Sequence, residues 1–231
     1  MVDFKFLLEQ VDTGEQATYL DWFIKGVGYT VSTSTVAFLL SLLLAVIIGS
    51  LMTLEGSKGK IARTLNRVSL SIPLVASLYI YYQVIPAVFF KEQLAVWNNT
   101  VLILVAGTIA LTQIMSARIA GHVYSALNSI PDDQKKACKA QGLTTYQSFR
   151  HVLIPQALKN ALPSITGEVK NTFKNSAALK LIGLMEVCGM MEQVINSTAM
   201  AIESFVICLV IYLILNSLVD LASYTINKAI K

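Results

Sequence analysis

Long, mainly apolar stretches alternate along this chain with shorter polar and basic segments. Such stretches cover Tyr29 to Leu54 and, roughly, residues 68–90, 100–122 and 205–226. Each exceeds the ~20 residues with which an α-helix crosses ~30 Å of hydrocarbon. The pattern therefore predicts a transmembrane helix in each of these stretches.

A less apolar stretch, residues 160–179, is a further candidate span, although hydropathy alone leaves open that it is not a span at all. It holds Glu168, Lys170, Asn171, Lys174, Asn175 and Ser176. Ionisable groups at membrane depth are costly and tend to face a bundle interior or an aqueous path. If the stretch crosses the membrane, these side chains are candidates for the substrate pathway.

The distribution of charge favours a crossing. Basic residues gather in regions 58–67, 135–159 and 228–231, whereas residues 1–26 are mainly acidic. The positive-inside rule places the basic regions in the cytoplasm and the N-terminus outside. Opposite sides for the two ends require an odd number of spans, so residues 160–179 are expected to form the fifth.

The domain organisation follows from this topology. We expect residues 1–26 to form an external segment, either a helix at the membrane interface or a partly ordered acidic tail. This segment lacks the charge pattern of a cleaved signal peptide. Residues 27–231 are then expected to form a single transmembrane domain.

Composition agrees with a membrane protein and narrows its chemistry. The chain is 55% hydrophobic and 14% charged, which indicates an all-α integral membrane protein. Cys138, Cys188 and Cys208 are far apart in sequence, and His122 and His151 are isolated. We therefore expect neither a metal site nor a disulfide framework. The sequence has no GxxxxGK[ST] phosphate loop, so we expect no bound cofactor and no ATP hydrolysis by this chain.

The polar segment from Pro131 to Pro155 is predicted to form two short helices. Pro131 and the two aspartates after it favour a helix start, and Gly142 suits a left-handed stop. Between them, Ala137 and Ala140 leave a smooth surface against which another protein could pack. The plain alternative is a solvated loop that merely contains glycine and proline.

A second helix start follows directly. Thr144 and Gln147, three residues apart, fit a capping box. Pro155 is expected to interrupt this second helix. The prediction is thus a pair of helices bent about a glycine on one side of a membrane.

The order of residues here resembles the Glu-Ala-Ala loop of permease subunits of ABC importers. Lys136-Ala137-Cys138 stands at the Glu-Ala-Ala position, Gly142 follows after three residues, and Leu153-Ile154-Pro155 closes the pattern. Residues 129–163 resemble the polar amino acid branch in particular. In that family the loop forms a coupling helix that docks into a cleft of the ATPase subunit. The resemblance implies these ATPase contacts: Lys136, Ala137, Cys138, Ala140, Gln141, Gly142, Leu143, Ile154 and Pro155.

Other positions depart from the family's pattern. Pro73 alone remains of a stretch that usually reads Arg-Gly-Thr-Pro, and Lys136 replaces the glutamate that opens the loop motif. Ile114, Arg118 and Gly121 stand where the family tends to have Asn, Tyr and Glu. These departures concern the substrate pocket more than the ATPase contact. They leave open a heterodimer whose other permease carries more of the pocket, or an unusual substrate.

Residues 174–183 are similar to a family segment that usually reads Lys-Asp-Thr-Ser-Leu before Ile-Gly. This similarity makes Lys174 and Asn175 the best pathway candidates. The resemblance also implies the five-helix fold of type I ABC importer (MetI-like) permeases, with a cytoplasmic coupling loop over residues 131–158.

The function implied is that of an inner-membrane permease subunit for a polar amino acid. Its expected partners are membrane lipids, ABC ATPase subunits that bind ATP and Mg, an external substrate-binding protein and a second permease, identical or different. No nucleic acid is expected. The open alternatives are a permease for another small solute (methionine or a compatible solute), a secondary transporter and a membrane-embedded hydrolase.

Overall fold

The computed structural model describes residues 4–11, 16–84, 86–87 and 99–230. Over these residues the regular structure is helical, apart from one isolated antiparallel bridge between Gln10 and Thr18. The chain divides into two compact units. The first comprises Met1–Ala37, Leu74–Leu111 and Asn171–Leu218, and the second comprises Phe38–Pro73, Thr112–Lys170 and Val219–Lys231.

Long helices dominate the described chain, and they contribute residues to both units. They are α1 (Tyr19–Met52), α5 (Asn99–Asn128), α8 (Ile154–Ser176) and α10 (Ala201–Ile230). Among the described residues, α1, α5 and α10 are long and apolar enough to cross a membrane. They confirm the first, third and last predicted spans. At 23 residues, α8 reaches about 35 Å, but it is more polar, so its crossing stays a prediction.

The second predicted span, residues 68–90, is wrong as a single helix. Helix α2 (Gly56–Ser71) occupies the basic connection and ends before Pro73. Ile72, the residue before the proline, is extended with φ −84° and ψ 121°. Proline lacks the N–H that would continue the helix and disfavours helical geometry in the residue before it. Helix α3 (Leu74–Tyr79) and a π-helical segment, η2 (Ile80–Val84), follow, and residues 85 and 88–90 lie outside the described chain.

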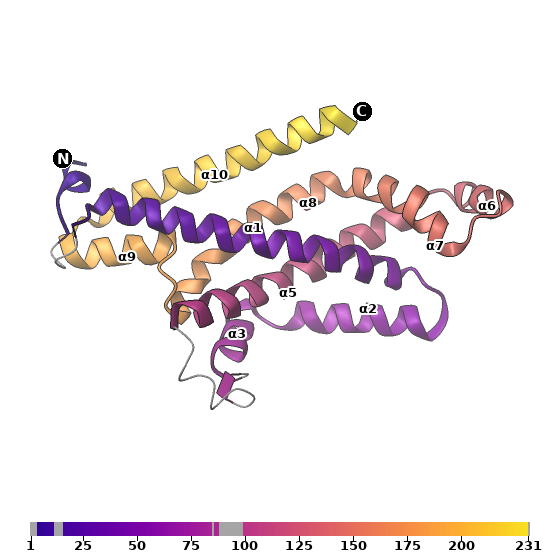
Figure 1. The fold of residues 1–231 in the computed structure, drawn as a ribbon, viewed down its shortest axis with the longest axis horizontal. Helices are drawn as coiled ribbons and strands as arrows, with labels where there is room; N and C mark the ends of the chain where they lie inside the picture. Colours follow the sequence, from indigo (N-terminus) through magenta and orange to yellow (C-terminus); the bar gives the residue numbers. More distant parts are fainter. Residues whose placement is uncertain (1–3, 12–15, 85, 88–98, 231) are drawn as a thin grey trace. The chain divides into compact units, whose positions relative to one another are not determined.

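The first unit packs the N-terminal residues against α9 (Val187–Thr198), which follows the 3₁₀ segment η5 (Ala177–Ile182) (Figure 1). Phe6 and Trp22 are buried in one cluster with Val187 and Val194. Phe6 lies in a short 3₁₀ helix, η1 (Lys5–Leu8). The described part of residues 1–26 is therefore tied into this unit by apolar side chains.

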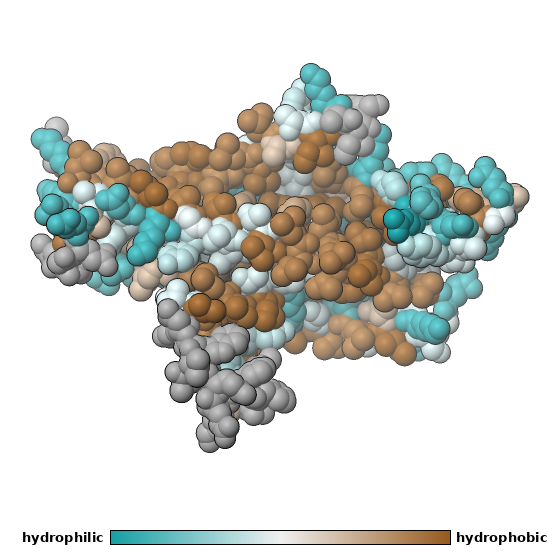
Figure 2. Space-filling view, viewed as in Figure 1, coloured by the Kyte–Doolittle hydropathy of each residue, from teal (hydrophilic) through white to brown (hydrophobic). Residues whose placement is uncertain are grey.

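The second unit holds α2 and parts of the long helices around an apolar core. Buried side chains such as Met115, Val123 and Ile165 form this core. The Asn66 side chain donates to the Ala117 carbonyl at 3.1 Å, which joins α2 to α5. Figure 2 shows hydrophobic side chains over the C-terminal part of α1, which belongs to this unit, and hydrophilic ones around α6 (Asp132–Ala140). That contrast is the expected one for a lipid-facing helix and a solvent-facing segment.

Candidate functional site

Helix α6 is a short, charged helix that follows α5 in the second unit. Asp132 and Asp133 occupy its first turn, as predicted, whereas Pro131 lies at the N-cap, one residue before the position expected for it. Lys135 contacts Asp132 at 3.0 Å, and this hydrogen bond lowers the pKa of the Asp132 carboxyl. The acidic first turn complements the positive end of the helix dipole.

Gly142 ends α6 in the left-handed conformation, with φ +75°, which confirms the prediction. Its N–H donates to the Lys139 carbonyl at 3.0 Å, and the Leu143 N–H donates to the Cys138 carbonyl at 3.1 Å. This pair of bonds is a Schellman motif, which satisfies the last carbonyls of the helix. A Cβ at Gly142 would meet no atom within 4 Å, so only the backbone conformation opposes a side chain there.

Helix α7 (Thr145–Ser148) begins with the predicted capping box. The Gln147 N–H donates to Thr144 Oγ1 at 3.2 Å, and the Thr144 N–H donates to Gln147 Oε1 at 2.9 Å. The prediction that Pro155 interrupts this helix is wrong. A π-helical turn, η4 (Phe149–Leu153), continues α7 into α8, and Pro155 is the second residue of α8. Proline has no N–H to donate to the preceding turn, and the π-helical turn changes the hydrogen-bond pairing just before it.

The predicted ATPase contacts are mostly on the surface. Exposed members are Lys136, Ala137, Ala140, Gln141, Gly142 and Pro155, and half-buried members are Leu143 and Ile154. Cys138 is the exception, since it is 5% exposed and faces the interior. A cavity of about 510 Å³ adjoins the segment, lined in part by Lys136, Lys139 and Leu143. The segment thus offers backbone and small side chains, with lysines around them.

On α8, Glu168 is paired with two basic residues of α5, both in the second unit. Arg118 Nη1 lies 3.5 Å from Glu168 Oε2, and His122 Nε2 lies 3.4 Å from Glu168 Oε1. The Glu168 side chain is 14% exposed, whereas those of Arg118 and His122 are 39% and 37% exposed. The sequence offered a signal for this site: Arg118 and His122 are four residues apart, and residues at this spacing share one face of a helix.

Lys170 also lies on α8, and its side chain is paired with Asp220 of α10. The Nζ to Oδ1 distance is 2.7 Å, and Thr166 and Ser223 share a 2.7 Å hydroxyl contact between the same helices. Sequence reasoning missed Asp220, although it is the one charge within residues 205–226. Ionisable groups at membrane depth usually pair with one another, and both Glu168 and Lys170 are paired here.

The other predicted pathway residues of α8 belong to the first unit. Lys174 is exposed, and Asn171 and Asn175 are half-buried. Ser176 is fully buried and donates to the Phe173 carbonyl at 2.7 Å. Ser176 therefore fits a structural role, while Lys174 is the most accessible charge of this part of α8.

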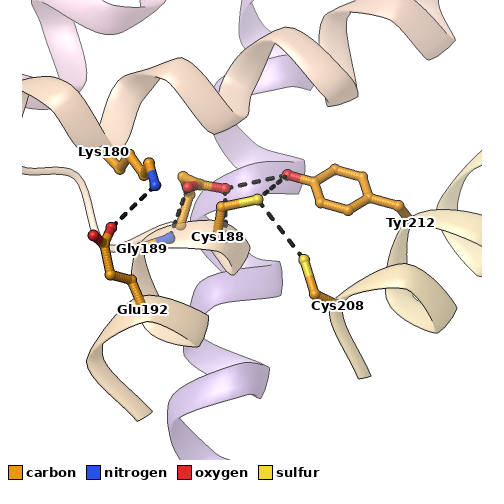
Figure 3. A network of polar contacts seen from close by, with 7 residues as sticks. Lys180, Cys188, Gly189, Glu192, Cys208 and Tyr212 are labelled. Carbon is orange, nitrogen blue, oxygen red and sulfur yellow. Dashed lines mark hydrogen bonds and ion pairs between the residues drawn. The ribbon is translucent and has the colours of Figure 1, made fainter. Parts of the chain in front are cut away.

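Glu186, which sequence reasoning did not single out, is fully buried at the N-cap of α9. Its carboxylate accepts from the Cys188 N–H and the Gly189 N–H, each at 2.9 Å, and from the Tyr212 hydroxyl at 3.2 Å (Figure 3). Burial raises the pKa of the Glu186 carboxyl. Lys180 does not reach this carboxylate and instead contacts Glu192 at 3.0 Å.

Comparison with curated proteins finds relatives over the whole length. The glutamate/aspartate import permease protein GltJ of Escherichia coli (strain K12) is 28% identical over 233 residues, covering 97% of this chain and 93% of that protein. The arginine ABC transporter permease protein ArtM of Haemophilus influenzae is 26% identical over 213 residues, covering 92% and 93%. The probable glutamine ABC transporter permease protein GlnM of Bacillus subtilis is 30% identical over a shorter match of 110 residues, covering 48% and 51%.

Comparison with solved structures finds the same fold. A chain of the crystal structure of an amino acid ABC transporter with histidines superposes with a TM-score of 0.75 at 22% identity, covering 91% of this chain and 95% of that one. A chain of the inward-facing MetNI methionine ABC transporter also gives 0.75, at 23% identity, covering 92% and 97%. These likenesses establish the type I importer permease fold. The model of the family "binding-protein-dependent transport system inner membrane component" matches residues 19–231, and the chain therefore belongs to that family.

Proposed function

We propose that this protein is the permease subunit of an ABC importer that moves a polar amino acid across the cytoplasmic membrane. The observation that carries the proposal is the exposed α6–α7 segment, whose two capped helices meet at a left-handed Gly142. Its relatives of similar length support the substrate class, since their names specify glutamate, aspartate and arginine.

ATP hydrolysis belongs, in this proposal, to partner ATPase subunits that hold ATP and Mg. The α6–α7 segment docks into them, with Ala137 and Ala140 allowing close approach and Lys136 at the rim. Because the Schellman motif and the capping box hold the segment in one shape, a movement of the ATPase would be transmitted to α5 and α8. A differential fit to two ATPase states would then shift the permease between outward and inward access.

The proposed orientation places the N-terminus outside and the C-terminus in the cytoplasm. The basic residues of α2, the coupling segment and the chain end support it. The packing of the N-terminal residues against α9 gives the external side a folded surface. That surface is where an external binding protein would deliver its substrate, and a second permease would complete the pathway.

The proposed pathway includes the polar face of α8. Its candidates are Glu168, Lys170, Asn171, Lys174 and Asn175, whereas the fully buried Ser176 is left out of the proposed pathway. Arg118 and His122 join this set because both contact Glu168. Lys174 is the best candidate for a substrate carboxylate, since Lys170 is already paired with Asp220.

The test is transport by the reconstituted complex. The permease, its ATPase, its partner permease and its binding protein are placed in liposomes, and uptake of labelled glutamate, glutamine, arginine, methionine and betaine is compared. We expect ATP-dependent uptake of glutamate, glutamine or arginine. Uptake of methionine or betaine alone would overturn the substrate class, and uptake driven by an ion gradient without ATP would overturn the importer mechanism.

Single variants test the pathway. Lys174→Ala and Asn175→Ala are expected to reduce uptake at least tenfold while the complex still assembles, because each removes a polar group from the pathway. Ser164→Ala, at an exposed α8 position outside the candidate set, is the matched control and should transport normally. Unchanged uptake by both variants, or loss of assembly instead, would remove the pathway role.

A further inference from the structure

Two cysteines that are distant in sequence meet in the first unit. Cys188 lies in the first turn of α9 and Cys208 lies on α10, 20 residues later. Their Sγ atoms are 3.7 Å apart (Figure 3), although both are free thiols here. The spacing of the cysteines along the chain did not indicate this contact.

We propose that Cys188 and Cys208 form a disulfide bond in the cell, which ties α9 covalently to α10. The proposal rests on the proposed orientation, with α9 on the outer side of the membrane. There, in an oxidising compartment, a disulfide persists, whereas cytoplasmic thiols are kept reduced.

The surroundings hold the two thiols in place. Cys208 is 7% exposed and lies in the cluster that also contains Val187 and Met191. The Tyr212 hydroxyl, one turn along α10 from Cys208, donates to Glu186 and lies 3.6 Å from the Cys188 Sγ. The start of α9 is therefore fixed to α10 by apolar and polar contacts around the thiol pair.

The two sulfur atoms need to move only a short way to form the bond. A disulfide has its sulfurs ~2.04 Å apart. The Sγ atoms of Cys188 and Cys208 are 3.7 Å apart, so they must approach each other by ~1.7 Å for the bond to form. No third cysteine competes within the described residues of this unit, because Cys138 belongs to the second unit.

The chemistry is thiol–disulfide exchange with a dithiol–disulfide oxidoreductase of the cell envelope. Cys188 is the half-buried and more accessible thiol, so its thiolate attacks one sulfur of the oxidant's disulfide and forms a mixed disulfide. Cys208 then attacks the Cys188 Sγ and displaces the oxidant's second thiolate. The protons of the two cysteines end on the oxidant's two sulfurs, so it leaves as a dithiol reduced by two electrons.

The test counts thiols in protein taken directly from cells. Membranes from cells quenched in acid are denatured and labelled with a maleimide–polyethylene glycol of fixed mass, with and without prior reduction. The chain has three cysteines. We expect one adduct, on Cys138, without the reductant and three adducts after reduction.

Matched variants assign the bond. Cys138→Ser is expected to show no adduct without reductant and two after it, because the pair is untouched. Cys188→Ser is expected to show two adducts with or without reductant, since Cys208 loses its partner. The wild-type count stands on its own if either variant is poorly produced.

Three outcomes would overturn the proposal. These are three adducts without reductant, a dimer that dissociates on reduction, and pairing that appears only after the solubilised protein is incubated with oxidised glutathione. Transport is measured separately on the same preparation. Transport by a protein with three free thiols would refute the disulfide alone, and one adduct in a complex without transport would refute the proposed function alone.

Discussion

Two connecting segments, α6–α7 and α9, are built from the same local devices and used in opposite ways. Each contains a helix with a side-chain N-cap, Thr144 for α7 in one and Glu186 for α9 in the other. Each contains a helix end in the left-handed conformation, at Gly142 with φ +75° and at Ala199 with φ +60°. Local sequence thus specifies the shape of both segments.

The difference lies in what surrounds them. The polar contacts of α6–α7 join neighbours in sequence, and Tyr146 at its surface is 68% exposed. In α9 the cap is fully buried and reaches Tyr212, 26 residues away, and the Val187 N–H donates to Thr30 at 3.3 Å. The surface of α6–α7 is thus free to bind a partner outside the chain, whereas the surface of α9 is largely buried against the rest of its own unit. Substitutions in α9 should therefore affect folding, and those in α6–α7 should affect coupling.

The largest effect is expected for Glu186→Ala. It removes the acceptor of two backbone N–H groups and of the Tyr212 hydroxyl, all inside the first unit. Buried donors left without partners cost about 2–4 kcal/mol in total. We expect a lower midpoint of thermal unfolding in detergent and a lower yield. Glu186→Gln keeps an acceptor oxygen and should lose less, and equal stability of all three proteins would show that the cap is dispensable.

The next effect concerns coupling rather than stability. Gly142→Asp places a Cβ in a left-handed conformation, at a cost of about 1 kcal/mol, and puts a charge on the proposed docking surface. Ala140→Glu adds a charge at the same surface. We expect both proteins to insert in the membrane but to recover little ATPase on purification, or to leave ATP hydrolysis unresponsive to substrate. Thr145→Ser, at an exposed position of α7, is the control and should be nearly silent.

This prediction separates the two segments directly. Normal transport by Gly142→Asp, measured beside ATP hydrolysis in liposomes, would mean that α6–α7 is a passive connection. A large loss of thermal stability in Gly142→Asp would mean that α6–α7 is as structural as α9. Either result would remove the contrast between them.

The features predicted from sequence were those with a local cause. The left-handed Gly142 and the Thr144–Gln147 capping box depend on residues within a few positions, and both are present. Long apolar runs likewise predicted helices α1 and α10. Such features can be predicted because they depend on the backbone preferences of residues within one helical turn.

The features that were missed depend on distant partners. Pairing of Lys170 with Asp220 spans 50 residues, and contact between Cys188 and Cys208 spans 20. Which faces of two helices meet is set by packing, and no local preference reports it. The continuous helix through Pro155 was missed for another reason, because the π-helical turn before it changes the usual consequence of a proline.

A smaller, local effect is expected for Thr144→Ala. It removes the side-chain acceptor for the Gln147 N–H, and losing such a cap costs about 1 kcal/mol. Because the cap is exposed and its contacts are local, we expect the amides of α7 to exchange hydrogen roughly fivefold faster, with the global unfolding midpoint unchanged. A lower global midpoint would show that α7 folds as one unit with the core.

The smallest effect is expected to be a gain, for Ala199→Gly at the end of α9. Ala199 is exposed and holds φ +60°, ψ 8°, while its N–H donates to the Ile195 carbonyl at 2.8 Å. A non-glycine residue pays for its Cβ in this conformation, and glycine does not, so we expect stability to rise by about 0.5–1 kcal/mol. The reverse change, Gly142→Ala, should weaken the end of α6 by a similar amount. The gain at Ala199 should raise the midpoint of thermal unfolding, because α9 belongs to the packed core of its unit, whereas the loss at Gly142 should appear only in local hydrogen exchange. Equal shifts of the midpoint by both variants would show that the two helix ends are anchored alike.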